Sequence, residues 1–407
     1  MMTRVLLVTT VRWPSAARIA AAFAKTGAEV CALFPRGHVL NESRYPKTKF
    51  EYRPLFALSS LRAAFACEPD LVVPCDDRAL QFLLELARRE PVSRMARTIE
   101  RSLGNITHYP GLVSRKGFIE AAREAGIRAP ETLALVHELD LEEAIIQLGL
   151  PLVIKSDGSW GGDGVAIAHT RDEARAAWRR MSAPPSRLRN LVRAGRRRDS
   201  HYLRDAIVRP SPHVSAQAFV AGNPATTALA AWNGNVVAAL HMDVVKAEGT
   251  GPASVLSRVK SCEMDEAARK LARKFGLSGL HGLDFVRDEN GQAHLIEINP
   301  RATQTSHLAF GEGADLPAAL IAAANGSRSF VRPAIEAATV ALFPQAWLAD
   351  PASACLSNAH HDVPWDDLGV LRACVAMAPQ TGTALSLQYP ANMAPLAAAN
   401  SQLLTIP

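Results

Sequence analysis

The most informative stretch of this sequence is His281-Gly-Leu-Asp-Phe-Val-Arg-Asp-Glu-Asn-Gly-Gln-Ala-His-Leu-Ile-Glu-Ile-Asn-Pro-Arg301. Alternating apolar residues flank Asn290-Gly291, a dipeptide that favours a two-residue type I′ hairpin turn. With that turn, Asp284 lies directly opposite Glu297, with Cβ atoms about 5 Å apart. Asn299 lies two residues further along its strand and points to the same face. Two carboxylates and an amide oxygen are therefore predicted to meet on one surface of a hairpin.

Like charges directly opposite each other destabilise a hairpin unless something neutralises them. Mg²⁺ does so when one or two carboxylates hold it together with substrate phosphates. The alternative is an exposed hairpin whose acidic side chains are solvated. Apolar residues form the opposite face: Leu283, Phe285, Ile296 and Ile298. Because that face supplies a core, we predict that Asp284, Glu297 and Asn299 bind a divalent metal.

A second informative stretch is Leu152-Val-Ile-Lys155-Ser-Asp-Gly-Ser-Trp-Gly-Gly-Asp-Gly164. Lys155 ends an apolar strand, where a buried ammonium is costly unless it meets an anion. Four glycines follow: Gly158, Gly161, Gly162 and Gly164. Their backbone N–H groups can wrap phosphate oxygens. The alternative is a common glycine-rich hairpin beside a lysine that reaches solvent. The spacing matches neither a Walker loop nor a Rossmann fingerprint.

The first hundred or so residues alternate between apolar strands and helices, as in a doubly wound α/β domain. We expect strands at Val5–Thr10, Glu29–Phe34 and Leu71–Pro74, and helices at Ser15–Lys25, Leu61–Cys67 and Arg78–Arg89. Ligands of such sheets bind at the carboxyl ends of the strands, which places Asp76 and Asp77 beside a ligand. The alternative is that Asp76 caps the following helix. Because no glycine-rich loop follows the first strand, a dinucleotide site is not expected there.

A second unit is expected to begin near Gly111. Its predicted helices are Arg115–Gly126, Asp172–Met181 and Asp265–Phe275. Its predicted strands are Leu152–Lys155, Val165–His169, Val214–Val220, two strands within Ala225–Leu240, and the hairpin His281–Val286 with His294–Asn299. The two strands within Ala225–Leu240 are expected to join at Asn233-Gly234. The adjacent histidines His360 and His361 are interpreted as surface residues.

Composition excludes several classes of protein. The chain has 407 residues, 48% hydrophobic and 21% charged, as in a globular protein of several domains. No apolar run reaches the roughly 20 residues of a membrane span, so no membrane association is expected. The six cysteines form no CxxC pair, which predicts neither a zinc site nor a disulfide framework. We therefore expect a reduced, cytoplasmic protein.

Positive charge is concentrated in one segment. Ten arginines lie between Arg179 and Arg209, against Asp199 and Asp205, a local net charge of +8. The whole chain carries +6, so the remainder sums to −2. A nucleic-acid-binding protein would spread its charge over a face or groove, and no aromatic residue lies among the arginines of Arg187–Arg198 to stack bases. Nucleic acid is therefore not an expected partner.

The spacing of the arginines predicts a helix with one basic face at Arg189, Arg193, Arg196 and Arg197. Three uses remain open for this insertion. It can be a solvated surface segment, it can hold an anionic substrate group, or it can dock an acidic partner, such as a carrier protein, along Arg187–Arg198.

Taken together, these stretches resemble the ATP-grasp superfamily, the fold of carboxylate–amine ligases, biotin carboxylase and carbamoyl-phosphate synthetase. The resemblance covers about residues 1–325, and the D…E-x-N-P-R hairpin is its most specific part. It also includes Lys116 ahead of Ala125-Gly-Ile-Arg-Ala-Pro130, the lysine and glycine loop at Lys155, and a hinge at Gln217-Ala-Phe-Val220. The implied fold is α/β (α+β).

The resemblance also implies a domain organisation. Residues 1–110 would form a doubly wound pre-ATP-grasp domain, and residues 111–328 the ATP-grasp domain. A lid subdomain would span about 130–222 and contain the basic insertion 183–210, and residues 329–407 would form a small C-terminal region.

Roles for individual residues follow from the resemblance. Lys116 and Lys155 would hold the phosphates of ATP. The remaining implied nucleotide contacts are Gly161, Gly162 and Gly164 in the lid, and Gln217, Ala218, Phe219 and Val220 at the adenine. Asp284, Glu297 and Asn299 would bind one or two Mg²⁺ ions, with Mn²⁺ as an alternative. Arg301, with Lys155, would stabilise the transferring phosphoryl group.

Two features depart from the family pattern. The hinge often begins with a glutamate, where this chain has Gln217, and the usual ribose-binding acid is replaced by Asn223–Thr227. Lys246, Thr250–Ser254 and Arg258 fall where such enzymes often carry a substrate loop, although an ordinary solvated loop is the alternative.

The implied activity is an ADP-forming ligase that converts a small-molecule carboxylate into an acyl phosphate for attack by an amine. The alternatives are a carboxylase or synthetase that uses carboxyphosphate, and an ATP-binding regulator without activity. A homodimer is compatible with this fold.

Overall fold

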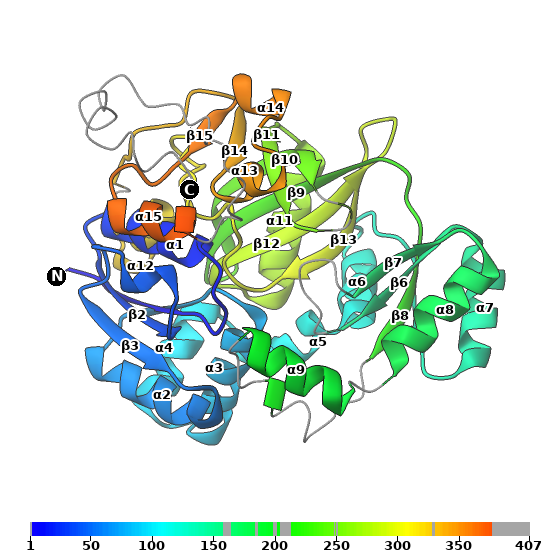
Figure 1. The fold of residues 1–407 in the computed structure, drawn as a ribbon, viewed down its shortest axis with the longest axis horizontal. Helices are drawn as coiled ribbons and strands as arrows, with labels where there is room; N and C mark the ends of the chain where they lie inside the picture. The colour runs from blue at the N-terminus through cyan, green and yellow to red at the C-terminus, as the bar shows by residue number, and fades with distance from the viewer. Residues whose placement is uncertain are drawn as a thin grey trace.

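Three β-sheets organise the chain, as the ribbon in Figure 1 shows. This computed structural model describes residues 2–157, 164–183, 186–197, 202–203, 213–247, 249, 251–327 and 330–376. Within these residues, an N-terminal sheet has the order β3-β2-β1-β4, a central sheet has the order β13-β12-β9-β10-β11-β14-β15, and a third sheet has the order β5-β8-β6-β7. The central sheet lies between the other two in Figure 1.

The N-terminal sheet is parallel throughout, with helices packed around it. Its elements are β1 (Arg4–Val8), α1 (Ser15–Ala24), β2 (Glu29–Pro35), β3 (Thr48–Tyr52), α2 (Ala57–Ala64), β4 (Leu71–Pro74), α3 (Asp77–Arg89) and α4 (Arg94–Leu103). The doubly wound arrangement confirms the prediction. Strand β3 was not predicted, because it is a mostly exposed edge strand whose sequence, Thr48-Lys-Phe-Glu-Tyr52, has little apolar character.

The central sheet is antiparallel except at its far edge, where β14 and β15 pair in parallel. Its strands are β9 (Asn223–Trp232), β10 (Asn235–Ala247), β11 (Ala253–Arg258), β12 (Gly279–Arg287), β13 (Ala293–Asn299), β14 (Thr339–Leu342) and β15 (His360–Asp362). Helix α11 (Cys262–Phe275) packs on one face and α12 (Leu316–Asn325) on the other, in separate apolar clusters. Asn233 and Gly234 both have positive φ, which confirms the predicted two-residue turn.

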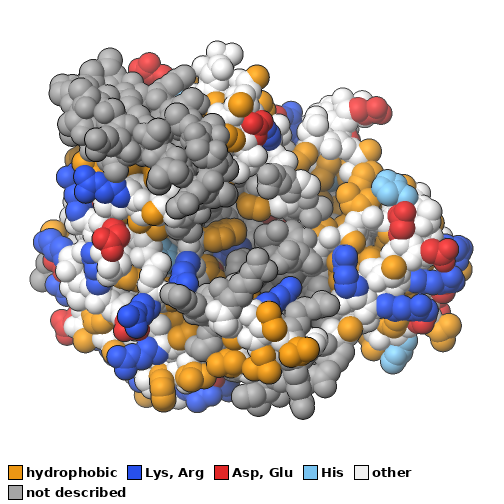
Figure 2. Space-filling view, in the orientation of Figure 1, with side chains coloured by type: hydrophobic (Ala, Val, Ile, Leu, Met, Phe, Trp, Pro, Cys, Tyr) orange, Lys and Arg blue, Asp and Glu red, His pale blue; other side chains and the backbone are white. Residues whose placement is uncertain are grey.

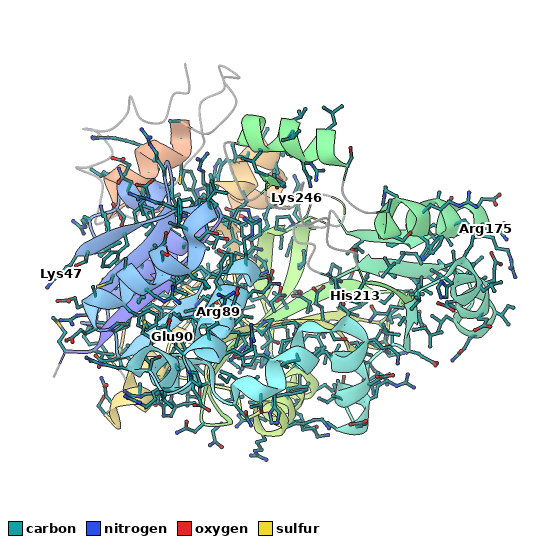
Figure 3. The ribbon with its side chains drawn as sticks, turned by 90° about the horizontal axis from the view of Figure 1, so that it is seen from below. Lys47, Arg89, Glu90, Arg175, His213 and Lys246 are labelled. Atoms are coloured by element: carbon teal, nitrogen blue, oxygen red, sulfur yellow. The ribbon has the colours of Figure 1, made fainter. Side chains whose placement is uncertain are left out.

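The third sheet comprises β5 (Thr132–Leu135), β6 (Leu152–Ser156), β7 (Val165–Ala168) and β8 (Val214–Ala218). Helices α7 (Glu138–Leu148) and α8 (Arg171–Ser182) cover one face, where Leu152, Ile154 and Ala216 are buried. Because side chains alternate along a strand, Lys155 and Gln217 lie on the other face. Figure 3 shows Arg175 on the outer side of this sheet and His213 on the side nearer the centre.

Shorter elements connect the sheets. They are α5 (Tyr109–Val113), α6 (Arg115–Glu124), α9 (Arg187–Arg197), α13 (Gln345–Ala349), α14 (Ala354–Ser357) and α15 (Leu368–Ala376). Within the described parts of the chain, no helix is both long and apolar enough to span a bilayer. All six cysteines lie within the described residues and are free thiols.

Helix α9 confirms the helix predicted from the arginine spacing, but its apolar residues are on the outside. Leu188, Leu191 and Val192 are exposed, whereas Asn190 and Ala194 are buried. Figure 2 shows hydrophobic side chains along the lower edge of the molecule, over α9. The side chains of Arg187, Arg189, Arg196 and Arg197, and all of Arg198, lie outside the described part of the structure.

Candidate active site

The hairpin of β12 and β13 places Asp284 opposite Glu297, as predicted, but by a different route. The predicted two-residue turn is wrong. Asp288 pairs with Gln292 across three loop residues, and only Gly291 among them has positive φ. The extra residue is absorbed by a bulge between Asp284 and Phe285, which restores the expected register at the two carboxylates.

The bulge also changes which residues form the core. Leu295 is fully buried, whereas Ile296, predicted to be in the core, is only half-buried. The other three apolar residues predicted for this face are buried as expected: Leu283, Phe285 and Ile298. Insertion of one residue in a strand therefore shifts one core position and leaves the polar face intact.

Asp284 is held by two hydrogen bonds. The Thr226 hydroxyl donates to Oδ1 at 3.0 Å, and the Asn299 amide nitrogen donates to Oδ2 at 2.8 Å. Burial, followed by the nearby Glu297 carboxylate, raises the pKa of Asp284 from 3.8 to about 6. The pair of carboxylates is therefore strained electrostatically until a cation or a proton neutralises it.

Arg115 contacts the second carboxylate. Its Nη2 lies 3.2 Å from Glu297 Oε1, and its Nε lies 3.4 Å from Asp157 Oδ1. Sequence reasoning selected Lys116 instead, whose Nζ pairs with Glu120 at 2.9 Å, one turn along the same helix. Neighbouring helical residues point about 100° apart, so only one of the two side chains can face the carboxylates. Ser114 caps the first turn of α6 and was the available signal for the helix start.

Lys155 is buried at the end of β6, where its Nζ donates to the Ile296 carbonyl at 3.3 Å. Burial lowers the pKa of Lys155 to about 8, opposed by Glu297. The glycine loop begins two residues later. Gly164 closes its base by accepting from the Ser156 N–H at 2.9 Å, whereas Gly161 and Gly162 lie outside the described residues.

The predicted adenine hinge is the end of β8. Gln217 is buried, and its Nε2 donates to the Thr132 hydroxyl at 3.0 Å. The backbone N–H of Ala218 donates to the Glu131 carbonyl, and Phe219 and Val220 continue beyond the strand, with Phe219 partly exposed. Ser215 pairs with Lys155 across the sheet, and its buried hydroxyl has no hydrogen-bond partner among the described residues. This face therefore carries a lysine and a hydroxyl, both suited to a phosphate.

Arg301 is buried and joined to both ends of the site. Its Nη2 donates to Asn299 Oδ1 at 3.0 Å, and its Nε donates to Asp77 Oδ1 at 2.9 Å. Burial disfavours the charged form, yet the carboxylates of Asp77, Asp76 and Asp284 together outweigh this effect and raise the pKa of Arg301. Asp284, Asn299, Arg301 and Asp77 therefore form one connected network.

The two N-terminal acids have separate roles. Asp76 caps α3 by accepting from the Ala79 N–H at 2.9 Å, and it also accepts from the hydroxyls of Thr9 and Thr10. The helix-cap alternative is thus confirmed for Asp76. Asp77 instead reaches Arg301, a contact between residues far apart in sequence that no local pattern could indicate.

The substrate-loop candidates are dispersed. Lys246 forms an ion pair with Asp350 at 2.9 Å, and Figure 3 shows it near the centre of the molecule. Arg258 is exposed above the Phe310 ring. The cross-strand row Asp284–Thr226–Met242–Arg258 places Arg258 on the same sheet face as the carboxylates. Thr250 lies outside the described residues.

His361, interpreted from the sequence as a surface residue, is buried, so that interpretation is wrong. Its Nε2 bonds the Leu356 carbonyl at 2.9 Å, and its ring packs edge-on against Trp347. On β15, the edge strand of the central sheet, it pairs with Ala341 of β14.

The donor set suits a hard cation bound together with a ligand. Within the described residues, no group of three or more His, Cys, Asp or Glu side chains could hold a metal by itself. Two carboxylates and one amide oxygen nevertheless match Mg²⁺ when phosphate oxygens complete its coordination. The residues present therefore fit Mg²⁺ bound with a nucleotide better than an isolated metal ion.

The chain is similar to known proteins in sequence and in fold. Residues 218–345 match the family described as "ATP-grasp in the biosynthetic pathway with Ter operon". The carbamoyl phosphate synthase large chain of Rubrobacter xylanophilus is 27% identical over 220 residues, which cover 51% of this chain and 19% of that protein. The carbamoyl phosphate synthase large chain of Vibrio vulnificus is 23% identical over 269 residues, which cover 59% of this chain and 23% of that protein. The matched region thus spans about a fifth of these relatives.

Solved structures share the fold over most of the chain. The biotin carboxylase domain of Hydrogenobacter thermophilus 2-oxoglutarate carboxylase, solved with MgADP, ADP and bicarbonate, has a TM-score of 0.58 at 16% identity and covers 83% of this chain and 72% of its own. N5-carboxyaminoimidazole synthase of Aspergillus clavatus, solved with ADP and 5-aminoimidazole ribonucleotide, has a TM-score of 0.57 at 16% identity, covering 82% and 78%. The chain therefore has the ATP-grasp fold. In sequence it is similar to an ATP-grasp family over residues 218–345 and to the carbamoyl phosphate synthase large chains over about half of its length.

Proposed function

We propose that this protein is an ATP-dependent, ADP-forming ligase that activates a small-molecule carboxylate as an acyl phosphate and joins it to an amine. The observation that carries the proposal is the connected network from Glu297 and Asp284 through Asn299 to Arg301, with Lys155 on the facing sheet. ADP-forming phosphoryl transfer needs positioning and charge neutralisation more than a protein nucleophile, and this network supplies both.

ATP is the proposed phosphoryl donor and Mg²⁺ the proposed metal. Mg²⁺, when bound, would neutralise charge on the phosphates. Asp284, Glu297 and Asn299 would hold it, and ionisation of Asp284 favours binding because it removes the proton that competes for the carboxylate. Lys155 would hold phosphate oxygens with the glycine loop Gly161–Gly164, whose described member, Gly164, lies at the base of that loop.

The reaction would proceed in two transfers. A carboxylate oxygen of the acceptor bonds to the γ-phosphorus while the bond to the bridging oxygen breaks, which releases ADP. The amine nitrogen then attacks the acyl carbon, phosphate leaves, and the nitrogen gives up a proton. Arg301, kept charged by Asp77, would stabilise the negative charge that spreads over the transferring group.

The nucleotide base is proposed to lie at the end of β8, along Gln217, Ala218, Phe219 and Val220. Phe219 offers an exposed ring and Gln217 an amide oxygen. The amide nitrogen of Gln217 is already used on Thr132, so the oxygen is the atom oriented for an adenine amino group.

A second candidate is a synthetase that makes carboxyphosphate from bicarbonate. It is favoured by one neighbour, the biotin carboxylase domain that was solved with bicarbonate. Bicarbonate would then take the place of the acceptor carboxylate beside Arg301, with the rest of the site unchanged.

The test is release of ADP and phosphate from MgATP across amino acids, other carboxylic acids and bicarbonate, each with and without an amine. We expect a carboxylic acid to stimulate ADP release, and an amine to convert the acyl phosphate to an amide detectable by mass spectrometry. Bicarbonate as the sole activator would favour the second candidate. ATP binding without ADP release for any acceptor would contradict both.

A further inference from the structure

Each of the four parallel strands of the N-terminal sheet is followed closely by an arginine. These residues are Arg53 after β3, Arg36 after β2, Arg12 after β1 and Arg78 after β4. The carboxyl ends of parallel strands meet at one edge of the sheet, which is also where ligands bind in doubly wound folds. We call this set the arginine edge.

Two of the loops are in direct contact. The Arg12 Nε donates to the Arg36 carbonyl at 3.0 Å, and the Arg12 guanidinium carbon lies 3.7 Å from the Cβ position of Gly37. His38, buried in the same loop, is kept neutral, because burial and then the charge of Arg12 lower its pKa to about 3. The Arg36 and Arg53 side chains are exposed, and those of Arg12 and Arg78 are half-buried.

Carboxylates at the same edge are already engaged. Asp76 accepts from Thr9, from Thr10 and from the Ala79 N–H. Asp77 is ion-paired with Arg301. In the described loops that directly follow the four strands, the charged side chains are Arg12, Arg36, Arg53 and Arg78 against Asp76 and Asp77, a local balance that suits an anion.

The arginine edge adjoins the candidate catalytic centre. The Ala302 N–H donates to the Pro74 carbonyl at 3.0 Å, at the end of β4, and Asp77 contacts Arg301. Strand β1 is the neighbour of β4, and β2 is the next strand beyond β1. At ordinary strand spacing, β1, which precedes Arg12, lies about 5 Å from β4, and β2, which precedes Arg36, lies about 10 Å from it. A ligand of that length would reach from these loops to Arg301.

We propose that the arginine edge binds a second anionic group of the acceptor, a phosphate or a carboxylate. The acceptor is then an acid whose reactive carboxylate lies beside Arg301 while another anion, about 5–10 Å away by strand spacing, is held by Arg12 and Arg36. This inference rests on the proposed ligase function for the identity of the reactive group, but the anion site can be tested without turnover.

The binding test uses two probes, inorganic phosphate and tricarballylate, titrated by calorimetry into the full chain saturated with MgADP. The test variant is Arg12→Ser/Arg36→Ser. The matched control is Arg88→Ser/Arg97→Ser, which removes two exposed arginines elsewhere in the same unit. We expect at least one probe to bind the wild type and the control equally, and the test variant at least tenfold more weakly. The preferred probe tells phosphate from carboxylate.

Equal binding to all three proteins, or no binding of either probe to the wild type, would overturn the inference. The single variant Arg36→Ser, which changes only an exposed side chain, keeps the test valid if the double variant unfolds, and it should weaken binding in the same direction. Arginine-dependent binding without ADP release for any acceptor would contradict only the ligase proposal. A third outcome is that the test variant turns over monocarboxylates and binds both probes as the wild type does. This outcome would contradict only the anion site.

Discussion

Arg301 and Asp77 form a half-buried ion pair, with 2.9 Å between Nε and Oδ1, although 224 residues separate them in the chain. Asp77 begins α3, directly after the acid that caps this helix, and Arg301 follows the strand that carries Glu297. The pair therefore links the carboxyl edge of the N-terminal sheet to the carboxylates of the central sheet. A substitution of Asp77 should therefore alter the position of Arg301 beside these carboxylates.

Asp77→Asn should lower kcat by about 10- to 100-fold, the usual effect of removing a supporting partner of a functional group. The amide keeps the size of the side chain but not the charge that orients Arg301. We expect KM for ATP to change little, because Asp77 is on the acceptor side of the site. Steady-state kinetics would check this, with Asp77→Glu as the rescuing control. A loss of thermal stability with unchanged kcat would make Asp77 a purely structural residue.

Glu297→Gln should abolish turnover and leave the fold intact. Its side chain is about a quarter exposed, so loss of the ion pair with Arg115 should cost little stability. The amide removes one of two charges available to Mg²⁺. Activity at increasing Mg²⁺ and a thermal melt would be measured together. Wild-type turnover at saturating Mg²⁺ would exclude Glu297 as a metal ligand.

The hairpin shows what the sequence could and could not predict. Alternation and the opposed acids were enough to place Asp284 and Glu297 on one face, because a core on the other face fixes the register. The turn was mispredicted, since one residue more in the loop is compensated by one more in the strand. A bulge is a local backbone feature with little sequence signal, and so Leu295 was not expected to replace Ile296 in the core.

Tertiary contacts account for the rest of the difference. Asp77 reaches Arg301 only because two sheets pack together, which no periodicity within either segment encodes. Strand β3 has little apolar character because it is a mostly exposed edge strand. Arg115 and Lys116 are adjacent and equally basic, so only the rotation of α6 against β13 decides which of them meets Glu297. The contacts that depend on the packing of separate elements were therefore the ones that the sequence could not indicate.

The raised pKa of Asp284 gives a pH dependence with a definite sign. Its value is 3.8 when solvated and about 6 in the fold, so the folded state binds more protons between about pH 4 and pH 6. The contribution of this group to stability therefore falls as pH rises through that range and stays at its lowest above pH 6. Thermal melts of the metal-free protein should show this decline, and Asp284→Asn should remove it. An identical slope in that variant would exclude Asp284 as its source.

Metal binding should follow the opposite trend. A protonated carboxyl cannot bind Mg²⁺, so with a pKa of about 6 the apparent affinity should be about tenfold weaker at pH 5 than at pH 8. Mg²⁺ titrations followed by nucleotide-dependent stabilisation at the two pH values would measure this. Equal affinity at both would show that Asp284 does not ligate the metal.

Arg115→Ala and Lys116→Ala form a matched pair, because they remove neighbouring cations from the first turn of the same helix. Arg115 contacts Glu297 and Asp157 at the candidate site, whereas Lys116 pairs with Glu120, and both of those side chains are substantially exposed. We expect Arg115→Ala to weaken binding of MgATP by roughly tenfold or more, as for a hydrogen bond to a charged group. Lys116→Ala should change binding less than twofold. Calorimetry with a non-hydrolysable ATP analogue would compare the two variants, and a larger loss in Lys116→Ala would restore the assignment made from the sequence.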